Sequence, residues 1–194
     1  MKERRIIHQV QQLGIGAGEC LELLQKAFMK NSLDVLHTFE HRLETLRQEE
    51  KDLMKQIRAL GQEERSLNGE LCCHMVRIFE CLEDMGKALQ MKISERILIS
   101  DRAVTEISYI SQELREMIKA ASDLVVVKNP VLVRYIQEAE SMISRTTTEY
   151  ATQHEERLIE GLCLPLASPI YLKLLESFKG IARETRKIAM VFSE

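Results

Sequence analysis

Hydrophobic residues recur every three or four positions along almost the whole chain, which is the spacing of one face of an amphipathic helix. This pattern predicts six helices. Their apolar stripes cover residues 6–28, 36–60, 71–89, 107–124, 132–143 and 174–188. We expect the long helices at about 33–60 and 129–160, and a helical pattern along almost the whole chain favours an all-α fold.

Residues that favour turns and helix starts separate these stripes. Asn129-Pro130 and Ser168-Pro169 each place a capping side chain before a proline at the first helical position. The segment LVVVKNPVLV, residues 124–133, also fits two short strands around a turn, and that alternative stays open at this point. The other breaks fall at Asn31-Ser32, Asn68-Gly69 and Ser94.

The two halves of the chain resemble each other. LELLQKAF (21–28) aligns with LREMIKAA (114–121), and LEDMGKALQM (82–91) aligns with FKGIARETRK (178–187), at offsets of 93 and 96 residues. A repeated unit is the economical explanation of two such similar offsets. We therefore predict one unit of three helices that occurs twice, in residues 1–93 and 94–194.

Composition agrees with long helices, since 45% of the 194 residues are hydrophobic but only 5% are aromatic. The 27 Lys and Arg nearly balance the 30 Asp and Glu, for a net charge of −3, which gives no footprint for nucleic-acid binding. Five cysteines, without a C-x-x-C pair or a signal peptide, predict reduced thiols and a cytoplasmic setting. The longest uncharged apolar run is far short of the roughly 20 residues of a membrane span.

The stretch HEERLIEGLCLPLASPIYLKLLESFKGIAR (154–183) resembles the PhoU family, and especially the cytoplasmic PhoU-like domain that follows the membrane part of bacterial sodium/phosphate cotransporters. LEDMGK (82–87) is similar to the Glu-Arg-Ile-Gly-Asp-like segment of such domains, and the resemblance covers essentially the whole chain. Five residues match the family's His-x-x-Arg-Leu, Gly and Ser layout: His154, Arg157, Leu158, Gly161 and Ser168.

The resemblance implies two tandem antiparallel three-helix bundles and a role, without catalysis, in phosphate transport or phosphate signalling. The implied partner is the membrane domain of a phosphate transporter, or a transport or signalling protein. A transporter partner would place the domain at the inner face of the membrane. Long amphipathic helices also leave an apolar flank that can dock another bundle or a second copy of the chain, as a homodimer.

This sequence departs from the multinuclear iron or zinc motif that family members often carry, in which two acids lie one helical turn apart. Lys87 replaces the second acid after Glu83, and the second half has Lys179 and Arg183 at both positions. A cation beside a metal site opposes the binding of further positive charge. We therefore expect no multinuclear cluster, and we expect Lys179 and Arg183 to neutralise acids such as Glu140 instead.

Glu40 and Glu44 keep the acidic pair of the first half, one helical turn apart. Together with Glu83 they form a candidate site for a single divalent metal, with the neighbouring lysine as an internal counterion. The alternative is a helix face held by salt bridges. The corresponding positions of the second half are Glu140 and Ser144, which are only half acidic.

Other constellations favour packing over chemistry. The three glycines of LGIGAGE follow no predicted strand and lack the spacing of a nucleotide-binding loop, so we expect them to allow close helix packing. Cys72, Cys73 and His74 are adjacent, and adjacent helical positions point in different directions, so they cannot converge on one ion. We expect thiols in the core.

Three functions remain open. We favour a regulatory domain similar to PhoU, without enzymatic activity and without a cofactor. A generic helical-bundle adaptor and a metal-carboxylate enzyme are the alternatives. The enzyme needs Glu-x-x-His pairs on two helices, whereas this chain offers only Asp34-x-x-His37, once. The cations Lys87, Lys179 and Arg183 also oppose it.

Overall fold

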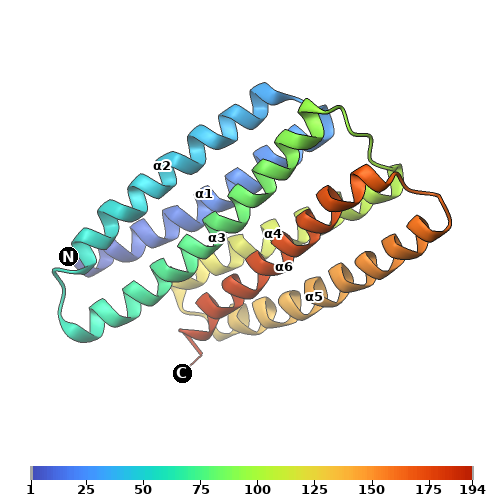
Figure 1. Ribbon diagram of the computed structural model, residues 1–194. Helices are drawn as coiled ribbons and strands as arrows, with labels where there is room; N and C mark the ends of the chain where they lie inside the picture. The colour runs from blue at the N-terminus through green and yellow to red at the C-terminus, as the bar shows by residue number, and fades with distance from the viewer. Residues whose placement is uncertain (1, 194) are drawn as a thin grey trace.

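The computed structural model describes residues 2–193, which form helices and their connections without any strand in that range (Figure 1). A 3-10 helix, Pro165–Ala167, leads into the last α-helix. The all-α prediction is confirmed for the described residues, and the strand alternative for residues 124–133 is wrong. No helix in the described range has the length and the apolar character that crossing a bilayer demands. The six α-helices are α1 (Lys2–Lys30), α2 (Leu33–Ile57), α3 (Gln62–Ser94), α4 (Asp101–Val127), α5 (Pro130–Ile159) and α6 (Ser168–Met190).

Local sequence determines most helix ends. The side chains of Ser32, Ser100 and Asn129 accept hydrogen bonds from backbone N–H groups two or three residues later, and so cap α2, α4 and α5. Pro130 follows at the start of α5, as predicted. At the other end of α5, Gly161 adopts a φ of 73°, a left-handed cap that favours glycine.

Three details of the predicted boundaries are wrong. α3 runs through Asn68-Gly69 without a break and, with 33 residues, is longer than α5 with 30. The side chain of Asn68 is buried, so packing holds the helix through a locally unfavourable pair. α2 ends at Ile57 after 25 residues and is not one of the long helices. Ser168 is the first residue of α6 rather than its cap, and its hydroxyl bonds to His154 instead.

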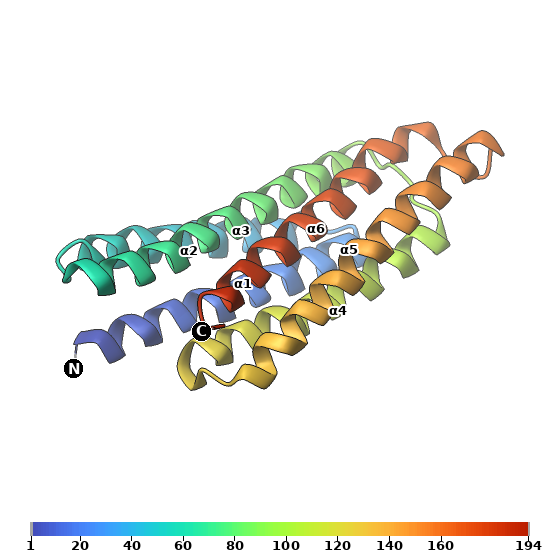
Figure 2. The ribbon, with the colours of Figure 1, turned by 90° about the horizontal axis from the view of Figure 1, so that it is seen from below.

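The six helices run alongside one another, with α1–α3 on one side and α4–α6 on the other (Figures 1 and 2). Within each half the three helices all contact one another, and the halves join where α1 packs on α4 and α3 packs on α6. α2 and α5 lie on opposite outer sides. One hydrophobic core draws on all six helices. The division into residues 1–93 and 94–194 as an internal repeat stays a prediction.

Glycine lets neighbouring helices approach closely at two of the three positions in LGIGAGE. A β-carbon at Gly14 would lie 2.4 Å from the Ser122 hydroxyl oxygen on α4, and one at Gly16 would lie 2.4 Å from a Leu46 methyl group on α2. Both distances are too short for real atoms, so the close-packing prediction is confirmed there. Gly18 would meet only an ordinary van der Waals contact.

The five cysteines are all free thiols, as predicted. Cys20 and Cys72 are buried, and burial raises the pKa of each thiol to about 12. Cys73 is exposed, because it faces away from the stripe that buries its neighbour. The prediction of core thiols in the Cys72-Cys73 pair therefore holds for Cys72 alone.

Candidate functional site

The predicted metal acids of the first half lie together between α2 and α3. Glu40, Glu44 and Glu83 all line a hollow of about 260 Å³. Glu40 and Glu44 are exposed. Glu83 is held between two cations, because Lys87 Nζ lies 2.8 Å from one carboxylate oxygen and Arg47 pairs with the other. Hydrogen bonds from Lys87 and then from Arg47 lower the pKa of the Glu83 carboxyl.

This geometry favours a salt-bridged groove over a metal site. A divalent ion would have to compete with two cations that already neutralise Glu83. Within residues 2–193, no group of three or more His, Cys, Asp or Glu side chains is arranged to hold a metal ion. The acids Glu40, Glu44 and Glu83 share a hollow, but their arrangement gives a single metal ion no further support.

In the second half, the two cations that replace family acids both lie on α6. Lys179 donates to a threonine hydroxyl of α5 at 3.0 Å, and Arg183 Nε lies 3.5 Å from Glu184. Neither pairs with Glu140, which lies 3.9 Å from Arg186 Nε. The expected neutralisation of Glu140 by Lys179 and Arg183 is therefore wrong. Because α5 and α6 are antiparallel, an early residue of α5 meets a late residue of α6, which is Arg186.

Glu184 is itself a buried carboxylate between α3 and α6, with 2% of its surface exposed. Lys187 Nζ lies 2.9 Å from one of its oxygens, and His74 Nδ1 on α3 lies 2.8 Å from the other. Burial opposes ionisation, but the hydrogen bonds from Lys187 and His74 outweigh it, so the pKa of Glu184 is lowered. His74 therefore belongs to a contact between the two halves.

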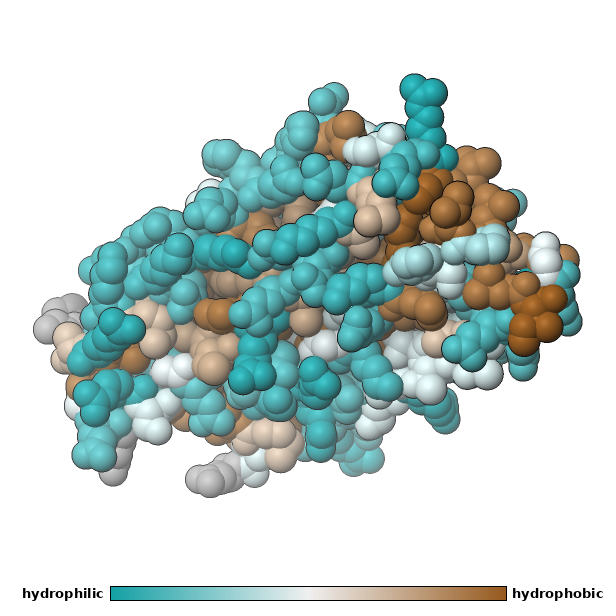
Figure 3. All heavy atoms as spheres, in the orientation of Figure 1, coloured by the Kyte–Doolittle hydropathy of each residue, from teal (hydrophilic) through white to brown (hydrophobic). Residues whose placement is uncertain are grey.

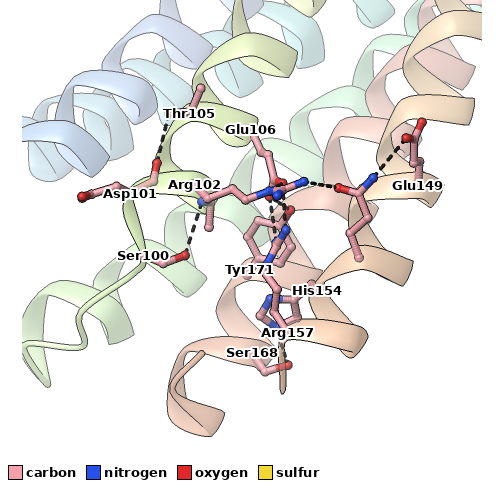
Figure 4. Close-up of polar contacts among 12 residues, drawn as sticks. Ser100, Asp101, Arg102, Thr105, Glu106, Glu149, His154, Arg157, Ser168 and Tyr171 are labelled. Carbon is pink, nitrogen blue, oxygen red and sulfur yellow. Dashed lines mark hydrogen bonds and ion pairs between the residues drawn. The ribbon is translucent and has the colours of Figure 1, made fainter. Parts of the chain in front are cut away.

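A second buried carboxylate, Glu106 of α4, is the centre of a polar cluster that joins α4, α5 and α6 (Figure 4). Arg157 of α5 donates through Nη1 and Nη2 to both carboxylate oxygens, each at 3.0 Å. Arg102 Nε donates at 3.0 Å, and the Tyr171 hydroxyl of α6 also donates. A carboxylate offers about four lone-pair sites, so these hydrogen bonds saturate it. Burial, and then the bond to Glu106, raise the pKa of Tyr171.

His154 lies next to this cluster, between α5 and the start of α6 (Figure 4). Its Nε2 shares a 2.9 Å hydrogen bond with the Ser168 hydroxyl, and its ring centroid lies 4.6 Å from that of Tyr171. Its Nδ1 is buried without a hydrogen-bond partner among the described residues. Burial, and then the charge of Arg157, lower the pKa of His154. A neutral imidazole with one unbonded nitrogen can make one more hydrogen bond.

A pocket of about 160 Å³ opens beside His154, where the α3–α4 and α5–α6 connections meet at one end of the molecule. We call it the end pocket. His154 and Tyr171 line it together with mainly apolar residues, among them Ala103 and Ala167. The side chains at its mouth are unusual, because large hydrophobic residues there are turned to solvent.

Five large apolar side chains around the end pocket are each more than half exposed. Figure 3 shows hydrophobic residues gathered at this end of the molecule, the right end in the view of Figure 1. An exposed apolar cluster of this kind marks an interaction site more often than single exposed hydrophobic residues do. We call the five residues the apolar end surface: Leu98 (73% exposed), Ile159 (88%), Leu162 (66%), Leu164 (56%) and Leu166 (74%).

Sequence reasoning named His154, Arg157 and Ser168 through the PhoU resemblance, but it missed Glu106 and Tyr171. A signal for Glu106 was present, because it lies within the apolar stripe of its helix, three residues after one buried residue and one residue before another. Arg157 likewise lies on the buried face of α5. Opposite charges on two core-facing stripes indicate a buried ion pair, since an unpaired charge is too costly there.

The class that the fold defines is an all-α helical bundle. Comparison with known proteins adds no family to that class, because no family model matches the chain and neither a curated protein nor a solved structure is significantly similar to it. The resemblance to PhoU therefore rests on the residues named in the sequence.

Proposed function

We propose that the chain is a regulatory or accessory domain without enzymatic activity, which acts in phosphate transport or phosphate signalling by binding another protein. The apolar end surface carries this proposal. Folded proteins seldom expose several large apolar side chains side by side unless another molecule covers them. The phosphate context comes from the sequence resemblance alone.

The ion pairs of Glu83 between α2 and α3 also support binding rather than metal chemistry. Glu83 is neutralised by Lys87 and Arg47, and Lys179 and Arg183 occupy the positions where family members have acids. These side chains give the outer faces of the helices a defined pattern of charge, and a docking partner can carry the complementary charges. A generic adaptor with no phosphate connection has the same surface, so the test must measure phosphate directly.

The experiment replaces Leu162 and Leu164 together with Asp in the gene of the native host and measures uptake of radiolabelled phosphate under phosphate-rich and phosphate-poor growth. Both side chains are exposed, so the fold should survive, as circular dichroism can verify. We expect the double variant and a deletion of the gene to change phosphate regulation in the same way. The matched control is Val131→Asp, which should behave as wild type. Val131 is also an exposed apolar residue, but it lies at the start of α5, whereas Leu162 and Leu164 follow the end of that helix.

Unchanged phosphate uptake and an unchanged phosphate-starvation response in the deletion strain would contradict the phosphate role. A phenotype outside phosphate metabolism, with the same dependence on Leu162 and Leu164, would assign the chain to the generic adaptor class. A double variant that behaves as wild type in a strain where deletion has an effect would show that the apolar end surface is not the part that acts.

A further inference from the structure

We infer that the apolar end surface and the end pocket bind a basic amphipathic helix of a partner protein, and that one tyrosine of that helix fills the pocket. This inference rests on the proposed function and specifies the chemistry of the partner. Three independent features of the described residues support it: the size of the pocket, its unsatisfied polar atom, and the charge around it.

The end pocket has room for one aromatic ring. Its volume of about 160 Å³ is close to that of cavities of about 150 Å³ that bind benzene. Its walls include Ala103, Ala167 and the ring of Tyr171. Leu162 and Leu164 line its mouth and are exposed, so they would surround the inserted ring and exclude water from it. A pocket within an apolar rim is the usual arrangement for an aromatic anchor.

His154 favours a ligand that can form a hydrogen bond inside the pocket. It lines the pocket with 2% of its surface exposed, and its Nδ1 has no hydrogen-bond partner among the described residues. A buried polar atom without a partner is unfavourable, so a ligand that supplies one gains affinity. A tyrosine hydroxyl can both donate and accept, and so satisfies either tautomer of the ring. Phenylalanine fills the same space but leaves Nδ1 unsatisfied.

The charge around the apolar end surface is mainly negative. In the described part of this end, Lys30 and Arg96 are exposed cations without a carboxylate partner, while Arg102 and Arg157 are both engaged by Glu106. A second copy of the chain would bring acid against acid, and an anionic membrane would be repelled, whereas a basic helix is attracted. Five exposed acids without an ion pair to any described residue border the surface: Glu95, Asp101, Glu155, Glu156 and Glu160.

The test uses the full chain and fluorescently labelled synthetic peptides that form amphipathic helices, with Lys on the polar face, Leu on the apolar face and one Tyr at the centre. Fluorescence anisotropy should show saturable binding. We expect the affinity to fall at least about tenfold when the central Tyr is Ala, because a pocket anchor is a binding hot spot. It should fall by a similar factor when the Lys residues are Glu, and several-fold when the Tyr is Phe.

Substitutions in the chain locate the site. Leu162→Asp combined with Leu164→Asp should abolish binding of the Lys peptide, and Val131→Asp should leave it unchanged. Equal affinity for the Tyr and Ala peptides would overturn the pocket assignment. Equal affinity for the Lys and Glu peptides would overturn the assignment of a basic partner.

Two other occupants give distinct results. Binding to phosphatidylglycerol vesicles that depends on Leu162 and Leu164, without binding of the Lys peptide, would assign the surface to a membrane. A homodimer in sedimentation that the same two substitutions dissociate would assign it to a second copy. Either result overturns this inference. If the chain binds the Lys peptide but deletion of its gene leaves phosphate regulation unchanged, only the proposed function is contradicted. If the deletion alters phosphate regulation but the chain does not bind the Lys peptide, only this inference is contradicted.

Discussion

Glu106 connects three helices because its two oxygens accept from donors on α4, α5 and α6 at once. Arg102 is one turn before it on α4, Arg157 comes from α5, and Tyr171 comes from α6. Charge and hydrogen bonding are both satisfied, so the carboxylate has no free lone pair for a substrate. The geometry therefore fits a structural role, and the neighbouring His154 is the group with remaining bonding capacity.

Glu106→Ala should lower the free energy of unfolding by about 3–5 kcal/mol, because it leaves the buried Arg157 without a counter-charge. The Tyr171 hydroxyl would lose its acceptor at the same time. Urea unfolding followed by circular dichroism measures the change. The matched control is Glu138→Ala, which breaks an exposed pair with Arg134 on one helix face and should leave the unfolding midpoint close to wild type. Equal effects of the two substitutions would contradict the role of Glu106.

Residue patterns predict the helices better than they predict this cluster. The three-four spacing of apolar residues identifies all six helices, because burial of one face is a local property of each segment. Two of the partners of Glu106, Arg157 and Tyr171, are 51 and 65 residues away along the chain, so no local pattern pairs them with it. Likewise the sequence predicts Glu83 to be a metal ligand, because Arg47 faces it only after α2 packs on α3.

At the scale of the elements, helix ends follow local chemistry where the backbone is exposed and tertiary packing where it is not. Asn129 and Gly161 act as caps, as their residue types favour. Asn68-Gly69 has the residues of a turn, yet the buried Asn68 lies inside α3. Asn and Gly occur both at the ends of α5 and inside α3, and burial decides whether a helix has an end there or continues.

Two substitutions of glycine by alanine should therefore change the free energy of unfolding in opposite directions. Gly161→Ala should lower the free energy of unfolding by about 1–2 kcal/mol, because its φ of 73° is unfavourable for any residue with a β-carbon. Gly69→Ala should raise it by about 0.5–1 kcal/mol, because alanine loses less backbone entropy inside a helix. Neither new β-carbon would meet an atom within 4 Å, so sterics do not enter. Thermal or urea unfolding of both variants measures these changes. If both substitutions change the free energy of unfolding in the same direction, the assignment of Gly161 as a left-handed helix cap is wrong.

At the scale of the whole molecule, the two halves share too much surface to behave as separate domains. α1 packs on α4 and α3 packs on α6, and the hydrophobic core continues across both contacts. The close approach of Gly14 to Ser122 and the hydrogen bond between His74 and the buried Glu184 lie on this boundary. The sequence comparison of the halves predicted two similar units, but it held no information on how they meet, because interface residues need not match between repeats.

We therefore expect one cooperative unfolding transition for the whole chain. Separating the halves would expose the apolar faces of four helices to water, at about 25 cal/mol for each Å² of apolar surface, and would leave Glu184 without its partner on α3. The chain contains no tryptophan, so single tryptophans at exposed sites can report on each half: Met91→Trp on α3 and Tyr135→Trp on α5. Their fluorescence and the circular dichroism should give the same urea midpoint, since coincident probes are the mark of a two-state transition. A lower midpoint for one tryptophan than for the other would show that one half unfolds first, and that the contacts of α1 with α4 and of α3 with α6 are weaker than their burial implies.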